Sequence, residues 1–311
     1  MIEFPKLNIN FLLNTGGIGD NICALPVMRY VKDTYPWITP YLYVPDYFLP
    51  IVKNTMPDLI ARPFSKGTKL FNGTWPGRQT LLKGHDSLST HLVDYNFHAL
   101  ANKQVEDKHK NYLKLNLDWI HTDKFKLPKD YVTIATGYTA PIRKFPAHTV
   151  NAIVKYLNDR DIQVVFLGSR QANTGGSVNN IISEFSEDID YSKGIDLVDK
   201  TSLLEAGKII ANSKCLVAID CGLMHIAGCT DAKIVGGYSS VDPIIRMPYR
   251  EGKLVYNCYP VEPPEDQPEK YFQSRTDFFY DHDFKFSYFK NDNLVNSLTA
   301  EMFIEQIKKV L

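Results

Sequence analysis

The most constraining feature of this sequence is an apolar run that stops at a glycine turn and continues as a helix-compatible segment. Residues 216–219 read Leu-Val-Ala-Ile, a pattern typical of a strand buried on both faces. A turn of Asp, Cys and Gly at 220–222 ends the run, and helix-compatible residues follow from Leu223. A strand that passes through such a turn into a helix presents free backbone N–H groups beyond the end of the strand. The sequence therefore predicts an anion site here, and phosphate is the expected anion.

The composition fits two domains and gives no net charge that would attract a strongly charged partner. The chain has 311 residues, of which 44% are hydrophobic, enough to build more than one core. Its 35 basic and 35 acidic residues balance, so no overall field attracts it to nucleic acid or to an anionic membrane. We therefore expect no strong nucleic-acid signal, while peripheral contact with a membrane through a local patch stays open.

Cysteine usage predicts reduced thiols. The five cysteines are odd in number and show no C-x-x-C spacing, so neither a disulfide framework nor a zinc site is expected. Residues 1–6 lack the features of a signal peptide, and no apolar run approaches the roughly 20 residues that span a bilayer. The expected location is the cytoplasm.

The first half opens with a strand, a glycine-rich loop and a helix. Residues 9–13 are apolar, the loop Asn14-Thr-Gly-Gly-Ile-Gly-Asp20 follows, and apolar residues recur at helical spacing over 21–32. The glycines permit a tight turn and a close approach of ligand to backbone. Because the loop matches neither G-x-G-x-x-G nor a Walker loop, it does not identify the ligand by itself.

Asp20 stands at the start of this helix and allows two interpretations. As the N-cap it would stabilise the helix by roughly 1 kcal/mol. As a general base it would act at the mouth of a cleft between two domains. The two roles are compatible, and the position alone leaves both open.

The chain repeats its opening plan after a polar segment at 118–130, where we place the domain boundary. A strand at 131–135 again precedes a loop and an amphipathic helix. This repeat predicts two Rossmann-like α/β domains, at 1–125 and 126–311. The last helix, 300–310, is amphipathic, and whether it packs back on the N-terminal domain is left open.

The remaining pattern predicts further strands, helices and loops. Strands are expected at 40–44, 162–167, 196–198 and 233–237, and helices at 47–52, 89–100, 147–157, 178–185 and from a cap at Thr201 or Ser202 through 211. Loops are expected at 65–83 and 260–267. His85, His91 and His98 lack the i,i+4 spacing of a helical metal clamp, so core or surface roles are expected, with an acceptor pocket as the alternative.

Four motifs of the second half, with one of the first, occur in a characteristic order. They are Gly19-Asp20-x-x-x-x-Leu25-Pro26, Arg143-Lys-Phe-Pro146, Asp199-Lys-Thr-Ser-Leu-Leu-Glu205, Asp220-Cys-Gly-Leu-Met-His225 and Tyr238-Ser-Ser-Val-Asp-Pro243. Their order and spacing resemble the heptosyltransferases of glycosyltransferase family nine. The similarity spans nearly the whole chain and is weakest from Lys53 to Leu127.

The resemblance implies a GT-B fold, in which two Rossmann-like α/β domains face each other across a cleft. It implies inverting, metal-independent transfer of a sugar, heptose or another, from a nucleotide-diphosphate sugar to an acceptor hydroxyl. A lipopolysaccharide or other surface glycan is the expected acceptor. The nucleotide sugar is a co-substrate, and no cofactor or metal is expected.

The resemblance also assigns residues to roles. The catalytic set is Asp20 as the base, with Arg143 and Lys144 as cations that meet the charge of the leaving diphosphate. The donor-binding set is Thr136, Gly137, Glu205, Asp220, Cys221, Gly222, Leu223, Met224, His225 and Asp242, and the acceptor-binding set is Asn14, Gly16 and Gly17.

Several positions depart from the family pattern. Arg143 then Lys144 replaces Lys then Arg, Cys221 stands where Ser or Thr is common, and Leu223 replaces a frequent proline. Because arginine and lysine are not equivalent at a phosphate, the donor is left open. Two alternatives remain: the same chemistry on a modified nucleobase or a protein, and a catalytically silent nucleotide- or glycan-binding protein of the same fold.

Overall fold

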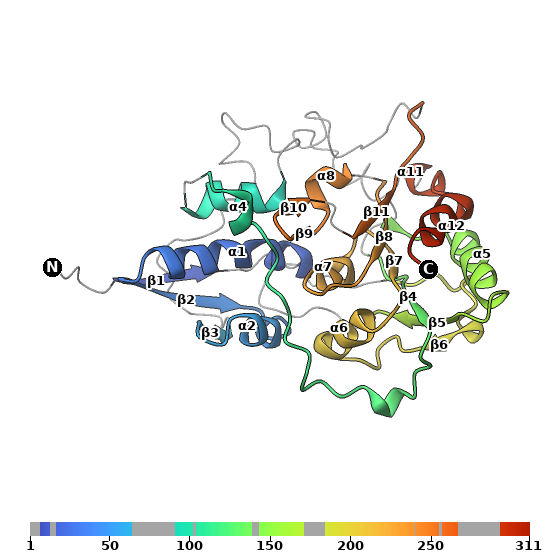
Figure 1. The fold of residues 1–311 in the computed structure, drawn as a ribbon, viewed down its shortest axis with the longest axis horizontal. Coiled ribbons are helices and arrows are strands. Elements are labelled where there is room, and N and C mark those ends of the chain that lie inside the picture. The colour runs from blue at the N-terminus through green and yellow to red at the C-terminus, as the bar shows by residue number, and fades with distance from the viewer. Residues whose placement is uncertain are drawn as a thin grey trace.

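The computed structural model contains two parallel β-sheets, each accompanied by helices, that lie side by side along the long axis of the molecule (Figure 1). It describes residues 7–12, 17–63, 91–101, 104–138, 143–170, 184–239, 241–254, 257–266 and 293–311. The expected loop at 65–83, His85, and most of the helix expected at 178–185 lie outside these residues. No described helix combines the length and the apolar character that a membrane crossing requires.

The N-terminal sheet is parallel, with the order β1-β2-β3. Its strands are β1 (Leu7–Leu12), β2 (Ile38–Val44) and β3 (Ile60–Pro63), and its helices are α1 (Ile18–Thr34), α2 (Leu49–Thr55) and α4 (Leu92–Ala101). The strands and helices expected from the sequence are all present here. Helix α1 packs against α4 and β2, which buries most of its length.

The C-terminal sheet has six parallel strands in the order β11-β8-β7-β4-β5-β6. The strands are β4 (Tyr131–Ala135), β5 (Gln163–Leu167), β6 (Ile195–Asp196), β7 (Leu216–Ile219), β8 (Ile234–Gly237) and β11 (Cys258–Val261). Counted along this half of the chain, the order is that of a doubly wound Rossmann sheet. Strand order reverses between the central strands β4 and β7, and ligands of such sheets bind beyond the carboxyl ends at that point.

The helices of this half are α5 (Ala147–Asn158), α6 (Leu203–Ala211), α7 (Gly222–Gly228), α8 (Pro243–Arg246), α11 (Asn293–Asn296) and α12 (Ala300–Lys308). Helix α6 begins with a full capping box, because the Ser202 side chain accepts from the Glu205 N–H and the Glu205 carboxylate accepts from the Ser202 N–H. Of the two expected caps, the structure selects Ser202. A small antiparallel pair, β9 (Tyr249–Arg250) and β10 (Lys253–Leu254), follows α8.

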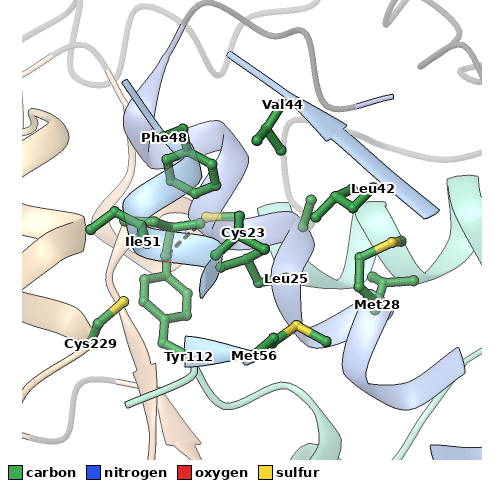
Figure 2. Packing of buried hydrophobic residues seen from close by; sticks show 14 of the residues in the cluster. Cys23, Leu25, Met28, Leu42, Val44, Phe48, Ile51, Met56, Tyr112 and Cys229 are labelled. Carbon is green, nitrogen blue, oxygen red and sulfur yellow. Dashed lines mark hydrogen bonds between the residues drawn. The ribbon is translucent and has the colours of Figure 1, made fainter. Parts of the chain in front are cut away.

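The two halves share one core at their junction. The cluster of buried side chains around α1 and β2 continues into α6, α7 and β9 through Leu204, Ile226, Cys229 and Tyr249. Tyr112, on the segment that connects the halves, and Cys229 lie beside the N-terminal cluster (Figure 2). Backbone bonds also tie the connecting segment to the second half, because Tyr112 N–H donates to Tyr249 O and Leu115 N–H to Cys229 O, each at 2.8 Å.

Two sequence predictions need correction, and one open point is decided. Helix α1 begins at Ile18 with Gly17 as its N-cap, so Asp20 lies inside the first turn and is not the cap. Strand β11 occupies 258–261, so the expected loop at 260–267 begins only after it, because its backbone pairs with β8. The packing of the last helix, which the sequence left open, is also decided: α12 packs against α5, β8 and β11 of the C-terminal half, where Phe303 is fully buried.

Candidate active site at the domain junction

Asp220 lies where the C-terminal sheet is expected to bind a ligand. It follows the last residue of β7, one of the two central strands, and its residue is only 6% exposed. Thr136 follows β4, the other central strand, and is also buried. The Thr136 hydroxyl lies 3.0 Å from the Tyr191 hydroxyl, and Gly137 lies against the Phe185 ring. These neighbouring strand ends therefore bring Thr136, Gly137 and Asp220 to one edge of the sheet.

Arg143 supplies positive charge at this edge. Its Nη2 lies 3.6 Å from Asp220 Oδ2. Lys144, the next residue, has its Nζ 5.9 Å from the centre of the Tyr138 ring. Burial would raise the pKa of Asp220, but Arg143, with His225 and Arg246, holds it well below its usual range. Asp220 is thus an anion that fixes cations around the strand end.

His225 continues the network from α7 into the N-terminal half. Its Nε2 lies 3.6 Å from Asp220 Oδ1, and its Nδ1 lies 2.9 Å from the Tyr112 hydroxyl. The Tyr112 hydroxyl in turn lies 2.8 Å from the Cys23 sulfur of α1, a bond drawn in Figure 2. A buried polar chain therefore runs from Asp220 to α1.

The surroundings of His225 favour its charged form. Burial would lower its pKa, but Cys23 and the Asp220 carboxylate raise the pKa of His225 to about 9. Burial raises the pKa of Tyr112 well above its usual range, and Cys23 adds to this, so the phenol stays neutral. As an imidazolium, His225 donates from Nδ1 to the Tyr112 oxygen, whose own O–H can point to Cys23.

Two glycines allow the helices α1 and α7 to meet. A Cβ atom on Gly19 would stand 2.4 Å from His225 Cδ2, and one on Gly222 would stand 3.1 Å from the Cβ of Ile18. Figure 1 shows α7 beside the start of α1, at the junction of the two sheets. The close contact brings the N-terminal turns of both helices, and hence Asp20 and Asp220, to the same region.

Asp20 projects from the first turn of α1 into this junction. Its Oδ1 accepts from Arg246 Nη1 of α8 at 3.2 Å, and its side chain is 35% exposed. Burial raises the pKa of Tyr47 to about 12, and the charge of Asp20 contributes to the shift. The predicted base is therefore a partly accessible carboxylate that faces a cation from the opposite half.

The other predicted residues have defined surroundings. Asp242 caps α8 by accepting from Ile244 N–H at 2.8 Å, and Met224 accepts from the Tyr238 hydroxyl at 3.0 Å. Besides its capping box, Glu205 pairs with Lys124 at 2.6 Å. Its predicted donor contact therefore remains a prediction.

Three further predicted residues lie at the helix starts, and two are outside the described residues. Cys221 is the N-cap of α7 and makes no side-chain capping bond, Leu223 follows in its first turn, and Gly17 is the N-cap of α1. Asn14 and Gly16 lie outside the described residues.

Sequence reasoning missed three residues of this site. Tyr112, Cys23 and Arg246 carried no motif, yet Tyr112 and Cys23 contact His225, and Arg246 contacts Asp20. The one local signal was the position of Arg246, three residues after the Asp242-Pro243 motif, where a short helix from that cap projects it. Among the described residues, no group of three or more His, Cys, Asp or Glu side chains is arranged to hold a metal ion.

Solved structures share this architecture at low sequence identity. The iron-containing heptosyltransferase TibC of enterotoxigenic E. coli, in complex with ADP-D-β-D-heptose, aligns with a TM-score of 0.72 and 14% identity, covering 99% of this chain and 77% of its own. A family 9 glycosyltransferase of Veillonella parvula aligns at 0.63 and 13% identity, covering 99% and 98%. E. coli heptosyltransferase WaaC with ADP aligns at 0.59 and 14% identity, covering 98% and 100%.

The fold is therefore GT-B, with two α/β domains. No curated protein matches the sequence. The sequence model of glycosyltransferase family 9 (heptosyltransferase) matches residues 80–270, more than half of the chain. The chain belongs to glycosyltransferase family 9 and is a glycosyltransferase.

Proposed function

We propose that this protein transfers a sugar, heptose or another, from a nucleotide-diphosphate sugar to an acceptor hydroxyl with inversion and without a metal ion. One observation carries the proposal. Asp20, a carboxylate of the N-terminal domain, pairs with Arg246, whose charge also acts on Asp220 at the switch point of the C-terminal sheet, where Arg143 lies. This is the arrangement that a base on one side of a junction and a diphosphate on the other require.

The donor is assigned to the C-terminal domain. Doubly wound sheets bind nucleotides beyond the carboxyl ends of the strands beside the switch point, and Thr136 and Asp220 follow those two strands. Arg143 lies beside Asp220 there, and guanidinium groups bind phosphate bidentately. We therefore assign the diphosphate to Arg143, Lys144 and the turn at 220–222.

Asp20 is assigned the role of base. In an inverting transfer, the acceptor oxygen attacks the anomeric carbon as the bond from that carbon to the diphosphate oxygen breaks. The acceptor hydroxyl loses its proton to the Asp20 carboxylate, and the nucleoside diphosphate leaves with the bonding electron pair. A single displacement inverts the anomeric centre. The partial exposure of Asp20 leaves its carboxylate accessible to an acceptor.

Protein cations take the role that a metal has in other transferases. The leaving diphosphate gains negative charge as the bond breaks, and fixed positive groups stabilise it. Arg143 and the charged form of His225 lie beside Asp220 at the strand end, and Lys144 follows Arg143 with its ammonium over the Tyr138 ring. We therefore propose that the transfer needs no metal ion.

A surface glycan is the proposed acceptor class. The heptosyltransferases that align with this chain include the E. coli ADP-heptose lipopolysaccharide heptosyltransferase II, at a TM-score of 0.60 and 14% identity over 97% of this chain. Family membership, rather than any contact of a described residue, supports an acceptor of this kind. A heptose donor linked to ADP is accordingly the first to test.

A panel of ADP-, GDP-, UDP- and CMP-linked sugars in a thermal-shift assay tests the donor proposal. One of them should raise the melting temperature in a concentration-dependent manner, since a ligand that binds only the native state stabilises it by mass action. The absence of any shift would contradict the donor site.

Transfer assays with the stabilising donor then test the chemistry. Asp20→Asn should abolish transfer while donor binding stays nearly unchanged, and wild-type transfer should persist in excess EDTA. Full activity of Asp20→Asn refutes the base, and loss in EDTA with recovery on adding a divalent cation refutes metal independence. Donor binding without transfer to any hydroxyl acceptor indicates the silent binding protein instead.

A further inference from the structure

Arg246 makes a different kind of contact from the other buried arginine of this region. Arg250 donates from Nη1 to the carbonyl oxygens of Thr230 and Ala232, at 2.8 and 2.9 Å, within its own domain. Arg246 donates across the junction to the carboxylate of Asp20, and its residue is only 8% exposed. A buried guanidinium that reaches a carboxylate of the other domain fixes the relative position of the two groups.

The backbone on both sides of Arg246 is held firmly. Asp242 caps the short helix α8, and Pro243 occupies its first turn, so Arg246 projects from a preorganised turn. At the next residue, Met247 O accepts from His91 Nε2 at 2.8 Å. His91 belongs to the N-terminal half, where its Nδ1 accepts from Val93 N–H at 3.1 Å at the start of α4. Two consecutive residues, 246 and 247, therefore bond to the opposite domain.

The guanidinium of Arg246 also reaches toward the donor side. Its charge acts on Asp220 and helps to keep the pKa of that carboxyl low, while the guanidinium donates to Asp20. No protein group among the described residues accepts from its buried Nε–H. Among the described residues, the Asp20 carboxylate is the acceptor of the Arg246 guanidinium, whereas Arg250 donates to main-chain carbonyls.

From this geometry we propose that Arg246 is the positioning residue that holds the Asp20 carboxylate against the donor domain and keeps it ionised. The inference rests on the proposed role of Asp20 as base. Arg246 donates to Oδ1 of the Asp20 carboxylate and so fixes the orientation of the group that takes the proton of the acceptor hydroxyl. Arg246 acts through Asp20 and is not itself a proton donor, because a guanidinium does not titrate in proteins.

Other charged and titratable groups near Asp20 could also contribute to the pH dependence of activity. The charge of Asp20 acts on Tyr47, near the start of α2. His225 of α7 lies against Gly19 in the same turn of α1, and the charge of Arg246 acts on Asp220 as well. Tyr47 is neutral below about 12. Arg246 forms an ion pair with Asp20, so its removal should act on the acid side of the activity profile.

The test compares Arg246→Gln, Arg246→Lys and the control Arg29→Gln. Arg29 lies on the same helix as Asp20 but pairs with Asp58 on the exposed side, with an Nη2–Oδ1 distance of 3.4 Å. Arg246→Gln should lower kcat about 10- to 100-fold, because a small misplacement of a catalytic group has an effect of this size. The acid limb of its kcat profile should move to higher pH by about one unit, since the carboxylate loses its cation. Arg246→Lys should recover most of both, and Arg29→Gln should match the wild type.

A second measurement separates this inference from the proposed function. Thermal unfolding of Asp20→Asn, Arg246→Gln and the double variant should give non-additive losses, because each single change breaks the same pair. An ADP titration should show nearly unchanged affinity in Arg246→Gln. If the wild type transfers sugar but Arg246→Gln keeps its kcat and its pH profile, the positioning role is refuted. If the wild type transfers no sugar while the unfolding cycle shows coupling, the proposed transferase function is refuted, but the interaction of Arg246 with Asp20 is supported. Additive losses in that cycle also overturn the inference.

Discussion

The imidazole of His225 lies directly against Gly19, so that a Cβ atom on Gly19 would stand 2.4 Å from His225 Cδ2. One residue belongs to the helix that carries the proposed base, and the other to the helix that follows the proposed diphosphate turn. The absence of a side chain at Gly19 therefore allows the two halves of the site to meet.

Gly19→Ala should destabilise the protein by about 1–3 kcal/mol, as overpacking of a well-packed site does. Gly222→Ala is the matched comparison, since its Cβ would stand 3.1 Å from the Cβ of Ile18 and requires a smaller adjustment. The free energy of unfolding in urea measures both. A smaller loss for Gly19→Ala than for Gly222→Ala would contradict the close packing of His225.

Tyr112→Phe should lower the free energy of unfolding by about 1–3 kcal/mol, because it leaves the buried Nδ1 of His225 without its hydroxyl partner. Tyr30→Phe is the control, since Tyr30 packs edge-on against Phe97 and no hydrogen bond of its hydroxyl is described. Equal free energies of unfolding for the two variants would show that the Tyr112 hydroxyl contributes nothing.

His225 should make stability fall on the alkaline side. Its folded-state pKa is about 9, above the value of about 6.5 for an unfolded chain. The stabilisation is therefore complete below pH 6.5 and is lost as pH rises through 9. His225→Gln should flatten this loss in urea unfolding measured across that range. An unchanged alkaline decline in the variant would assign it to other groups.

His91 should make stability fall on the acid side. Burial lowers the pKa of His91 to about 4, below the unfolded value of about 6.5. The neutral ring therefore contributes stability above pH 6.5 that is lost as pH falls toward 4. His91→Asn keeps a capping acceptor for α4 and should reduce this acid loss. His121→Asn, a change at an exposed histidine, should leave the acid limb as in the wild type.

Arg143→Met should destabilise the protein by about 1–3 kcal/mol, since it removes one of the cations that act on a buried carboxylate. Lys144→Met should change stability by less than about 0.5 kcal/mol. Both should weaken the binding of ADP measured by calorimetry if the diphosphate lies here. Equal stability of the two variants would argue against a structural role for the Arg143–Asp220 pair.

The sequence predicted the alternation of strands and helices well, because apolar periodicity is a local property. The strand 216–219, its polar turn and the following helix appear as expected. The order of the motifs also assigned Arg143 and Asp220 to one site. The two residues form an ion pair in the structure, although their motifs are far apart along the chain. Asp20 was misplaced as a possible cap because the helix start depends on Gly17, whose extended backbone a propensity argument does not reveal.

The missed residues depend on contacts between distant segments. Tyr112 and His225 are 113 residues apart, and Asp20 and Arg246 are 226 apart. A buried tyrosine hydroxyl or a short helix that presents an arginine has no distinctive local pattern. Their roles arise from contacts between the two halves. The sequence predicts that there are two domains but not which residues meet where they pack.

The shared core has a consequence for modular engineering. Side chains of α6, α7 and β9 complete the cluster that surrounds α1, and the connecting segment bonds to Tyr249 and Cys229. In a chimera joined near residue 125, the two sides of this interface would come from different parent proteins and would not be matched to each other. The smallest unit that can be exchanged between relatives is therefore the N-terminal half together with its complementary helices, and grafting the first half alone would leave an apolar face without its partner.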